Sequence, residues 1–179
     1  MAQNNITAHP LLCIDIGGTY IRWASYDGDT TDPIHHIEKS LTQRGVFPLK
    51  NQIRQIVRSS IETLEKDQTL DIAIGTPGKL VNGIIQTGSA ENLGTKPGEW
   101  DLFSWNAELQ SISQVEEITV INDAIAQMIG GYHQLEPNHP ELTNTKLAYI
   151  GPGTGLGGGF AHTKNGGLTP YSDGHIYDM

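Results

Sequence analysis

Two glycine-rich segments, each directly after a short apolar run, constrain the fold of this chain more than any other feature. The first spans residues 15–19 (DIGGT) after the run 11–14, and the second spans residues 151–159 after the run 147–150. Glycine permits sharp turns and a close backbone approach to a polyanion, so that amide N–H groups can converge on phosphate oxygens. The pattern predicts two strand-turn-strand units that hold a phosphate group from two sides.

The residues between these segments predict a mixed sheet with helices, and therefore an α/β fold. Apolar positions such as Ile53, Ile56 and Val57 recur at helical spacing and indicate an amphipathic helix. Strands are expected at 11–15, 20–26, 34–41, 70–75 and 117–121, and helices at 48–66 and 102–112 and from Asn122/Asp123, which can cap a helix. Residues 79–100 contain many turn-forming residues, which favour a hairpin and a surface loop.

A stretch with two prolines and two asparagines, residues 136–145, has the composition of a linker. It separates a first domain, 1–135, from residues 146–179. The latter begin like the first domain, with a strand, a glycine-rich turn and a further strand at 159–163. Their apolar strand residues (Leu147, Tyr149, Ile150 and Phe160) lack the rest of a domain to cover them, so we expect self-association, as a dimer.

Charge and composition exclude several classes of function. A net charge of −9 argues against general binding of nucleic acids or membrane surfaces, but not against a nucleotide, which needs only local N–H donors. The polar amino terminus resembles no secretion signal, and no apolar run approaches a membrane span, so a cytoplasmic protein is expected. The single cysteine, Cys13, permits no internal disulfide and fits a buried strand thiol.

The second glycine-rich segment also contains a G-x-G-x-x-G pattern at Gly153, Gly155 and Gly158. A dinucleotide-binding fold requires a helix directly after this pattern, because the pyrophosphate rests on the helix amino terminus. Here a short, glycine-bounded strand follows, which disfavours that fold. For either glycine-rich segment alone, a turn that merely closes a hairpin remains an equal alternative.

Two aspartates stand where strands end. Asp15 can bind Mg²⁺ beside the first turn, or simply cap that turn, and Arg22 can reach a phosphate or pair with an acid. Asp123 can accept the proton of an attacking hydroxyl, a role compatible with capping a helix. Three polar segments, 75–78, 89–93 and 172–175, fit hydrogen bonding to a polyol. Trp100 and Trp105 can stack on a sugar or pack a loop.

Five segments in order (15–22, 76–78, 92–100, 120–124 and 153–159) resemble motifs of the ROK/glucokinase group of sugar kinases, within the actin/hexokinase/Hsp70 superfamily. The resemblance covers most of residues 11–175. It implies a ribonuclease-H-like (actin-like ATPase) mixed-sheet domain followed by the first strands of a second domain. It also implies an ATP- and Mg²⁺-dependent hexose kinase, acting on the 6-hydroxyl of glucose.

The resemblance assigns roles to individual residues. Asp123 is the expected base, and Asp15 is expected to position Mg²⁺. The expected phosphate ligands, with Asp15, are Gly17, Gly18, Thr19, Gly153, Thr154 and Gly155. The expected sugar-pocket residues are Gly78, Ser89, Asn92, Asn122, Asp123 and His175.

Two departures from the family pattern qualify these expectations. Ser172 stands where the family has the glutamate of Glu-x-Gly-His, and the sequence ends four residues after His175, whereas family members continue into a substantial second domain. We therefore expect the first half of a kinase, with little or no activity alone. A non-catalytic sugar-binding or regulatory module is the alternative, and a truncated product without function is a third.

Overall fold

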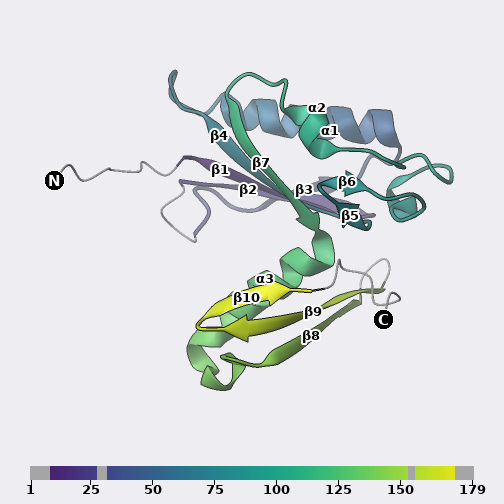
Figure 1. Cartoon of the computed structure of the whole chain (residues 1–179). Helices are drawn as coiled ribbons and strands as arrows, with labels where there is room; N and C mark the ends of the chain where they lie inside the picture. Colours follow the sequence, from purple (N-terminus) through teal and green to yellow (C-terminus); the bar gives the residue numbers. More distant parts are fainter. Residues whose placement is uncertain (1–8, 28–31, 153–155, 172–179) are drawn as a thin grey trace.

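The computed structural model describes residues 9–27, 32–152 and 156–171. It contains a five-stranded sheet, a three-stranded sheet and a small hairpin, with helix α3 (Asp123–Leu135) between the two larger sheets (Figure 1). No helix among the described residues is long and apolar enough to cross a bilayer.

The larger sheet has the strand order β3-β2-β1-β4-β7. Its strands are β1 (Leu11–Ile16), β2 (Tyr20–Tyr26), β3 (Glu38–Leu41), β4 (Leu70–Thr76) and β7 (Val115–Asn122). The first three pair antiparallel, and β4 and β7 continue parallel to β1. This arrangement confirms the predicted mixed sheet, although β3 begins four residues later than the predicted 34–41 strand and β7 begins two residues earlier than predicted.

Helix α1 (Val46–Ile61) covers one face of this sheet and provides much of the core. Its buried residues are Leu49, Ile53, Ile56 and Val57, the apolar stripe that the sequence indicated. They pack against alternate strand residues such as Leu12 and Ile14. The helix ends at Ile61 rather than at the predicted residue 66, because only turns continue from there to Leu64.

The region between β4 and β7 forms the expected hairpin, β5 (Leu80–Val81) with β6 (Ile84–Ile85), and a short 3₁₀ helix, η1 (Glu91–Leu93). The expected helix 102–112 shrinks to α2 (Trp105–Leu109). Leu102 has a positive φ of 59°, which no helix accommodates, and the Ser104 side chain caps the helix start. Trp100 and Trp105 are buried in the core, so they pack the loop and offer no sugar platform.

The smaller sheet has the order β10-β9-β8, built from β8 (Lys146–Pro152), β9 (Leu156–Lys164) and β10 (Gly167–Pro170). β9 begins three residues before the predicted strand, and β10 was not predicted. The predicted linker contains two 3₁₀ turns, η2 (Glu136–Asn138) and η3 (Pro140–Leu142). The domain boundaries drawn there stay predictions.

One face of the smaller sheet is covered, which corrects part of the sequence-based expectation. Ile125 and Met128 of α3 pack against Ala161, with Tyr149 and Leu168 at the margin of the cluster. The expectation of uncovered strands is therefore wrong for the face that carries Tyr149. It holds for Ile150 on the opposite face, which is 67% exposed.

Candidate active site

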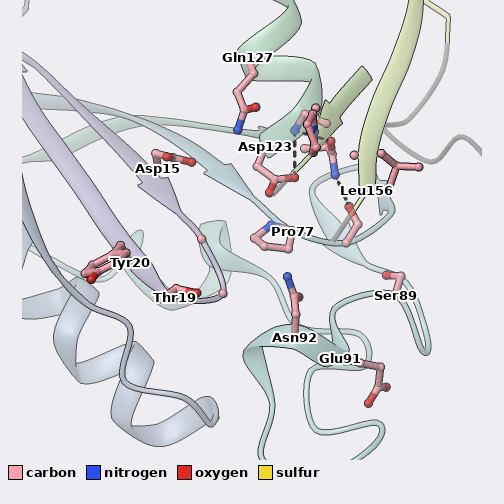
Figure 2. A pocket seen from close by; sticks show the side chains of 18 of the residues that line it. Asp15, Thr19, Tyr20, Pro77, Ser89, Glu91, Asn92, Asp123, Gln127 and Leu156 are labelled. Atoms are coloured by element: carbon pink, nitrogen blue, oxygen red, sulfur yellow. Dashed lines mark hydrogen bonds between the residues drawn. The ribbon is translucent and has the colours of Figure 1, made fainter. Parts of the chain in front are cut away.

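A cavity of about 640 Å³ lies between the carboxyl ends of β1, β4 and β7 and the β8–β9 hairpin. Figure 2 shows Asp15 and Thr19 on one wall, with Asp123, Ser89 and Asn92 on other walls. Nine of the predicted site residues line it: Asp15, Gly17, Gly18, Thr19, Gly78, Ser89, Asn92, Asn122 and Asp123. The remaining four, Gly153, Thr154, Gly155 and His175, lie outside the described residues.

The turn between β1 and β2 is held from behind by one threonine. The Thr42 hydroxyl donates to the Gly17 carbonyl at 2.6 Å, and the Thr42 N–H donates to the Thr19 carbonyl at 3.0 Å. The Gly17 N–H closes the turn by donating to the Tyr20 carbonyl at 2.9 Å. A Cβ at Gly17 would lie 2.9 Å from that same oxygen, so the turn requires glycine there. Because two of its carbonyls are bonded to Thr42, the turn is suited to an anionic ligand.

Asp15 lies directly opposite Arg22 in the β1–β2 register, and their side chains form an ion pair. Arg22 Nη1 donates to Asp15 Oδ2 at 3.2 Å. The sequence allowed Arg22 either to reach a phosphate or to pair with an acid. In the structure it pairs with an acid, Asp15. Both side chains are about half exposed, so the pair contributes little to stability and can rearrange when a ligand binds.

Gly75 of β4 separates the two aspartates that the sequence singled out. It lies beside Asp15 in the β1–β4 register and beside Ile121 in the β4–β7 register. A Cβ at Gly75 would lie 3.9 Å from Asp15 Oδ1 and 3.7 Å from the Asp123 Cα atom. Gly75 therefore lies in van der Waals reach of both aspartates, which line one cavity.

Asn122 caps α3 and also holds the loop that follows β4. Its side-chain oxygen accepts the N–H groups of Ala124 (2.9 Å) and Ile125 (3.2 Å), and its amide nitrogen donates to the Gly78 carbonyl at 3.0 Å. Asp123, the first residue of α3, accepts the Ala124 N–H at 2.9 Å. Of the two residues predicted to cap this helix, Asn122 and Asp123, Asn122 is the cap. Three of the four hydrogen bonds that its side-chain amide can make are already formed.

The loops of the lower wall in Figure 2 present Ser89 and Asn92. Gly78 has a φ of 106°, and a Cβ there would lie 3.1 Å from Ala90 Cβ, so this loop too requires glycine. The Ser89 hydroxyl accepts the Lys79 N–H at 3.0 Å and donates to the Gln86 carbonyl at 2.6 Å. Ser89 therefore shapes the loop, while Asn92 points its amide toward the cavity.

The opposite wall comes from the β8–β9 hairpin. Gly151, Pro152, Leu156 and Gly157 line it, and a Cβ at Gly157 would lie only 2.9 Å from Ala124 Cβ. The hairpin thus packs directly on the first turn of α3. The sequence did not single out Gln127 or Tyr20, which also line the cavity, as does Glu91 of the polar segment 89–93. Gln127 had a usable signal, because it lies one helical turn after Asp123 on the same face.

The model of the Glucokinase family matches residues 12–176. The chain belongs to the Glucokinase family. This membership confirms the resemblance noted from the sequence, together with the predicted mixed-sheet, actin-like kinase fold. None of the curated protein sequences matches the chain significantly.

Solved structures of this family group share the fold. The polyphosphate/ATP-glucomannokinase of Arthrobacter sp. strain KM matches with 22% identity and a TM-score of 0.66, over 92% of this chain and 62% of its own. A ROK family glucokinase of Streptomyces griseus, in complex with glucose and AMPPNP, matches with 20% identity and a TM-score of 0.65, over 93% and 48%. A ROK family transcriptional regulator, a homologue of the E. coli MLC protein, matches with 15% identity and a TM-score of 0.62, over 97% and 41%.

This family member therefore spans between about two fifths and three fifths of the length of these structures. Kinases and a regulator share its fold, so the fold alone does not decide between catalysis and regulation. The choice between catalysis and regulation therefore depends on the chemistry of the residues that line the cavity.

Proposed function

We propose that this chain carries the sugar and phosphate sites of an ATP-dependent hexose kinase that phosphorylates the 6-hydroxyl of glucose. The observation that carries the proposal is the shared cavity. It has Asp123 on one wall, a glycine-rich turn on another and hydrogen-bonding loops below. Sugar binding alone needs no phosphate-binding turn beside the sugar loop, whereas phosphoryl transfer needs both next to a carboxylate, so the cavity favours the kinase.

The sugar is proposed to lie on Asn92, the Gly78 loop and Asp123. Asn122 has one N–H left after its three hydrogen bonds, so it can serve the sugar with one donor at most. Ser89 is proposed to act by shaping this loop. His175 remains a proposed ligand outside the described residues.

The phosphates of ATP are proposed to lie on Gly17, Gly18 and Thr19. Gly153, Thr154 and Gly155 remain proposed ligands outside the described residues. Asp15 fits the requirements of Mg²⁺, because it offers a hard oxygen ligand that faces the cavity and is more than one-third exposed. Mg²⁺, when bound there, would neutralise charge on the transferred phosphoryl group. Arg22, released from Asp15, would then be available to other anionic groups.

Asp123 is proposed to receive the proton of the sugar 6-hydroxyl. The hydroxyl oxygen forms a bond to the γ-phosphorus, the bond from that phosphorus to the β,γ-bridging oxygen breaks, and its electron pair leaves with ADP. The hydroxyl proton passes to the Asp123 carboxylate. Its place at the amino terminus of α3 stabilises the negative charge that this role requires.

The proposal extends to the setting of the reaction. A cytoplasmic role in carbohydrate metabolism follows from the use of ATP and a hexose. Because the similar structures are longer, we expect at most slow turnover by the 179 residues alone. The activity of this chain is best measured over single turnovers.

Self-association through strand β8 is a further part of the proposal. Of the four edge strands in the two larger sheets, β3 carries Glu38 and Lys39, β7 carries Glu116 and Glu117, and β10 is short and ends in Pro170. The centre of β8, residues 147–151, has no charge and no proline. Charges and prolines protect natural edge strands from pairing with other chains, so among the described edges β8, with its uncharged centre between Lys146 and Pro152, is the least protected.

Titration calorimetry with glucose tests the sugar site. We expect wild-type chain to bind glucose and Asn92→Ala to bind it about tenfold more weakly, as loss of a good hydrogen bond predicts. Asn138→Ala, at an exposed asparagine in η2, is the matched control and should bind like wild type. Equal affinity of the Asn92→Ala and Asn138→Ala variants for glucose would contradict the proposed sugar site.

A further inference from the structure

Gln127 lies on the cavity wall without a role in the proposed reaction. It follows Asp123 by four residues on α3, so the two side chains share one face of the helix. Both line the cavity, as does Asp15 across from them. In Figure 2 the Gln127 side chain projects from α3 toward the space between the two aspartates.

Tyr149 of β8 holds the amide of Gln127 in one orientation. The Tyr149 hydroxyl donates to Gln127 Oε1 at 2.5 Å. The hydroxyl itself is confined, because the tyrosine ring lies over Gly151, where a Cβ would be 2.5 Å from the hydroxyl oxygen and 2.8 Å from ring atom Cε1. Glycine at position 151 thus makes room for the tyrosine that orients Gln127.

With its oxygen bonded to Tyr149, the amide turns its nitrogen, a donor of two hydrogen bonds, toward the cavity (Figure 2). Among the described residues, the charged ones that line the cavity are Asp15, Glu91, Asp123 and Arg22, and Arg22 is bonded to Asp15. A phosphate entering this predominantly acidic cavity needs donors that are not already bonded to carboxylates. A neutral amide between the aspartates suits that need.

We propose that Gln127 Nε2 donates a hydrogen bond to the phosphoryl group that is transferred, and that Tyr149 acts as its positioning residue. This inference rests on the proposed kinase function and extends it to two residues that the sequence motifs do not include. In this proposal the β8–β9 hairpin both forms one wall of the cavity and orients a hydrogen-bond donor on the helix that carries Asp123.

The test is binding of Mg²⁺-tripolyphosphate and Mg²⁺-ATP to the full chain, measured by calorimetry. Tripolyphosphate isolates the phosphate contacts, since it has no adenosine. We expect Gln127→Ala to weaken both ligands by about tenfold, the typical effect of one lost hydrogen bond to a charged group. Gln127→Glu should weaken them at least as much, because a carboxylate replaces the donor. Gln134→Ala, at an exposed glutamine of the same helix, is the matched control and should bind like wild type.

Tyr149→Phe tests the positioning role. It should weaken both ligands several-fold in the wild-type background and have no further effect in the Gln127→Ala background, which additive, independent roles would not produce. Glucose affinity should stay unchanged in all these variants. If wild type binds tripolyphosphate and Gln127→Ala binds it equally well, the inference is overturned while the kinase proposal stands. If wild type binds neither phosphate ligand, both are overturned.

Discussion

The side-chain amide of Asn122 donates to the backbone carbonyl of Gly78 at 3.0 Å and so joins the end of β7 to the loop after β4. The same amide caps α3 through its oxygen. One buried side chain thus fixes both the helix that begins with Asp123 and the loop proposed to hold the sugar. The two halves of the proposed sugar site are set relative to each other by this contact.

Replacing Asn122 should therefore cost both stability and sugar binding. We expect Asn122→Ala to lower the free energy of unfolding by about 2–3 kcal/mol, the sum of a lost cap and a lost buried hydrogen bond. Asn122→Ser keeps a capping oxygen but has no donor that reaches Gly78, so it should lose about half as much stability while still weakening glucose binding. Urea denaturation and calorimetry measure the two effects. Equal losses of stability in both variants would show that the cap contributes nothing.

The contact between Gly157 and Ala124 predicts a compensating pair. Gly157→Ala brings two Cβ atoms to 2.9 Å, which overpacks the hairpin against α3 and should destabilise the chain by about 1–3 kcal/mol. Ala124→Gly in the same chain removes the opposing Cβ and should recover most of that loss. Thermal unfolding of both single variants and the double variant measures this coupling. Additive losses in the double variant would contradict the close packing.

Glu99 predicts a pH-dependent contribution to stability. Its carboxylate accepts the Thr95 N–H at 2.7 Å and the Val46 N–H at 3.2 Å, and these hydrogen bonds, the Thr95 N–H first, hold the pKa of Glu99 below its ordinary value of 4.5. The folded chain therefore binds fewer protons at Glu99 than the unfolded chain. The resulting stability is present above the ordinary pKa and is lost as pH falls through the lower folded pKa.

Comparison with Glu99→Gln isolates this effect. Wild type should be the more stable chain at pH 7, and its advantage should shrink once the pH falls below the ordinary pKa of 4.5 and disappear below the lower pKa of the folded chain. Denaturant unfolding of the two chains between pH 7 and pH 3 gives the measurement. An advantage that persists unchanged at pH 3 would mean that the ionised carboxylate is not its source.

The proposed pairing through β8 predicts a dimer in solution. Light scattering should report twice the chain mass for wild type. Ala148→Lys places a charge at an exposed position in the centre of the edge strand and should give a folded monomer. Lys146→Ala, at the end of the same strand, is the control and should leave the dimer intact. A monodisperse wild-type monomer would refute the pairing.

Sequence patterns predicted most of the larger sheet, because alternating and helical periodicity follow directly from burial of one face. They placed Asp15, the first glycine-rich turn and Asn122–Asp123 at strand ends that meet at one cavity. They missed β10, a four-residue strand rich in turn-forming residues, and they did not show that α3 covers the smaller sheet. Contacts between distant segments, such as that between Tyr149 and Gln127, leave no local signal in one sequence.

Transfer of labelled phosphate from ATP to glucose tests the central claim most directly. With excess enzyme, Mg²⁺ and γ-labelled ATP, wild type should form glucose 6-phosphate slowly. Asp123→Asn should retain glucose binding within a few-fold and lose transfer by at least a hundredfold, the scale of a missing general base. Glucose 6-phosphate formed at the wild-type rate by Asp123→Asn would contradict the account.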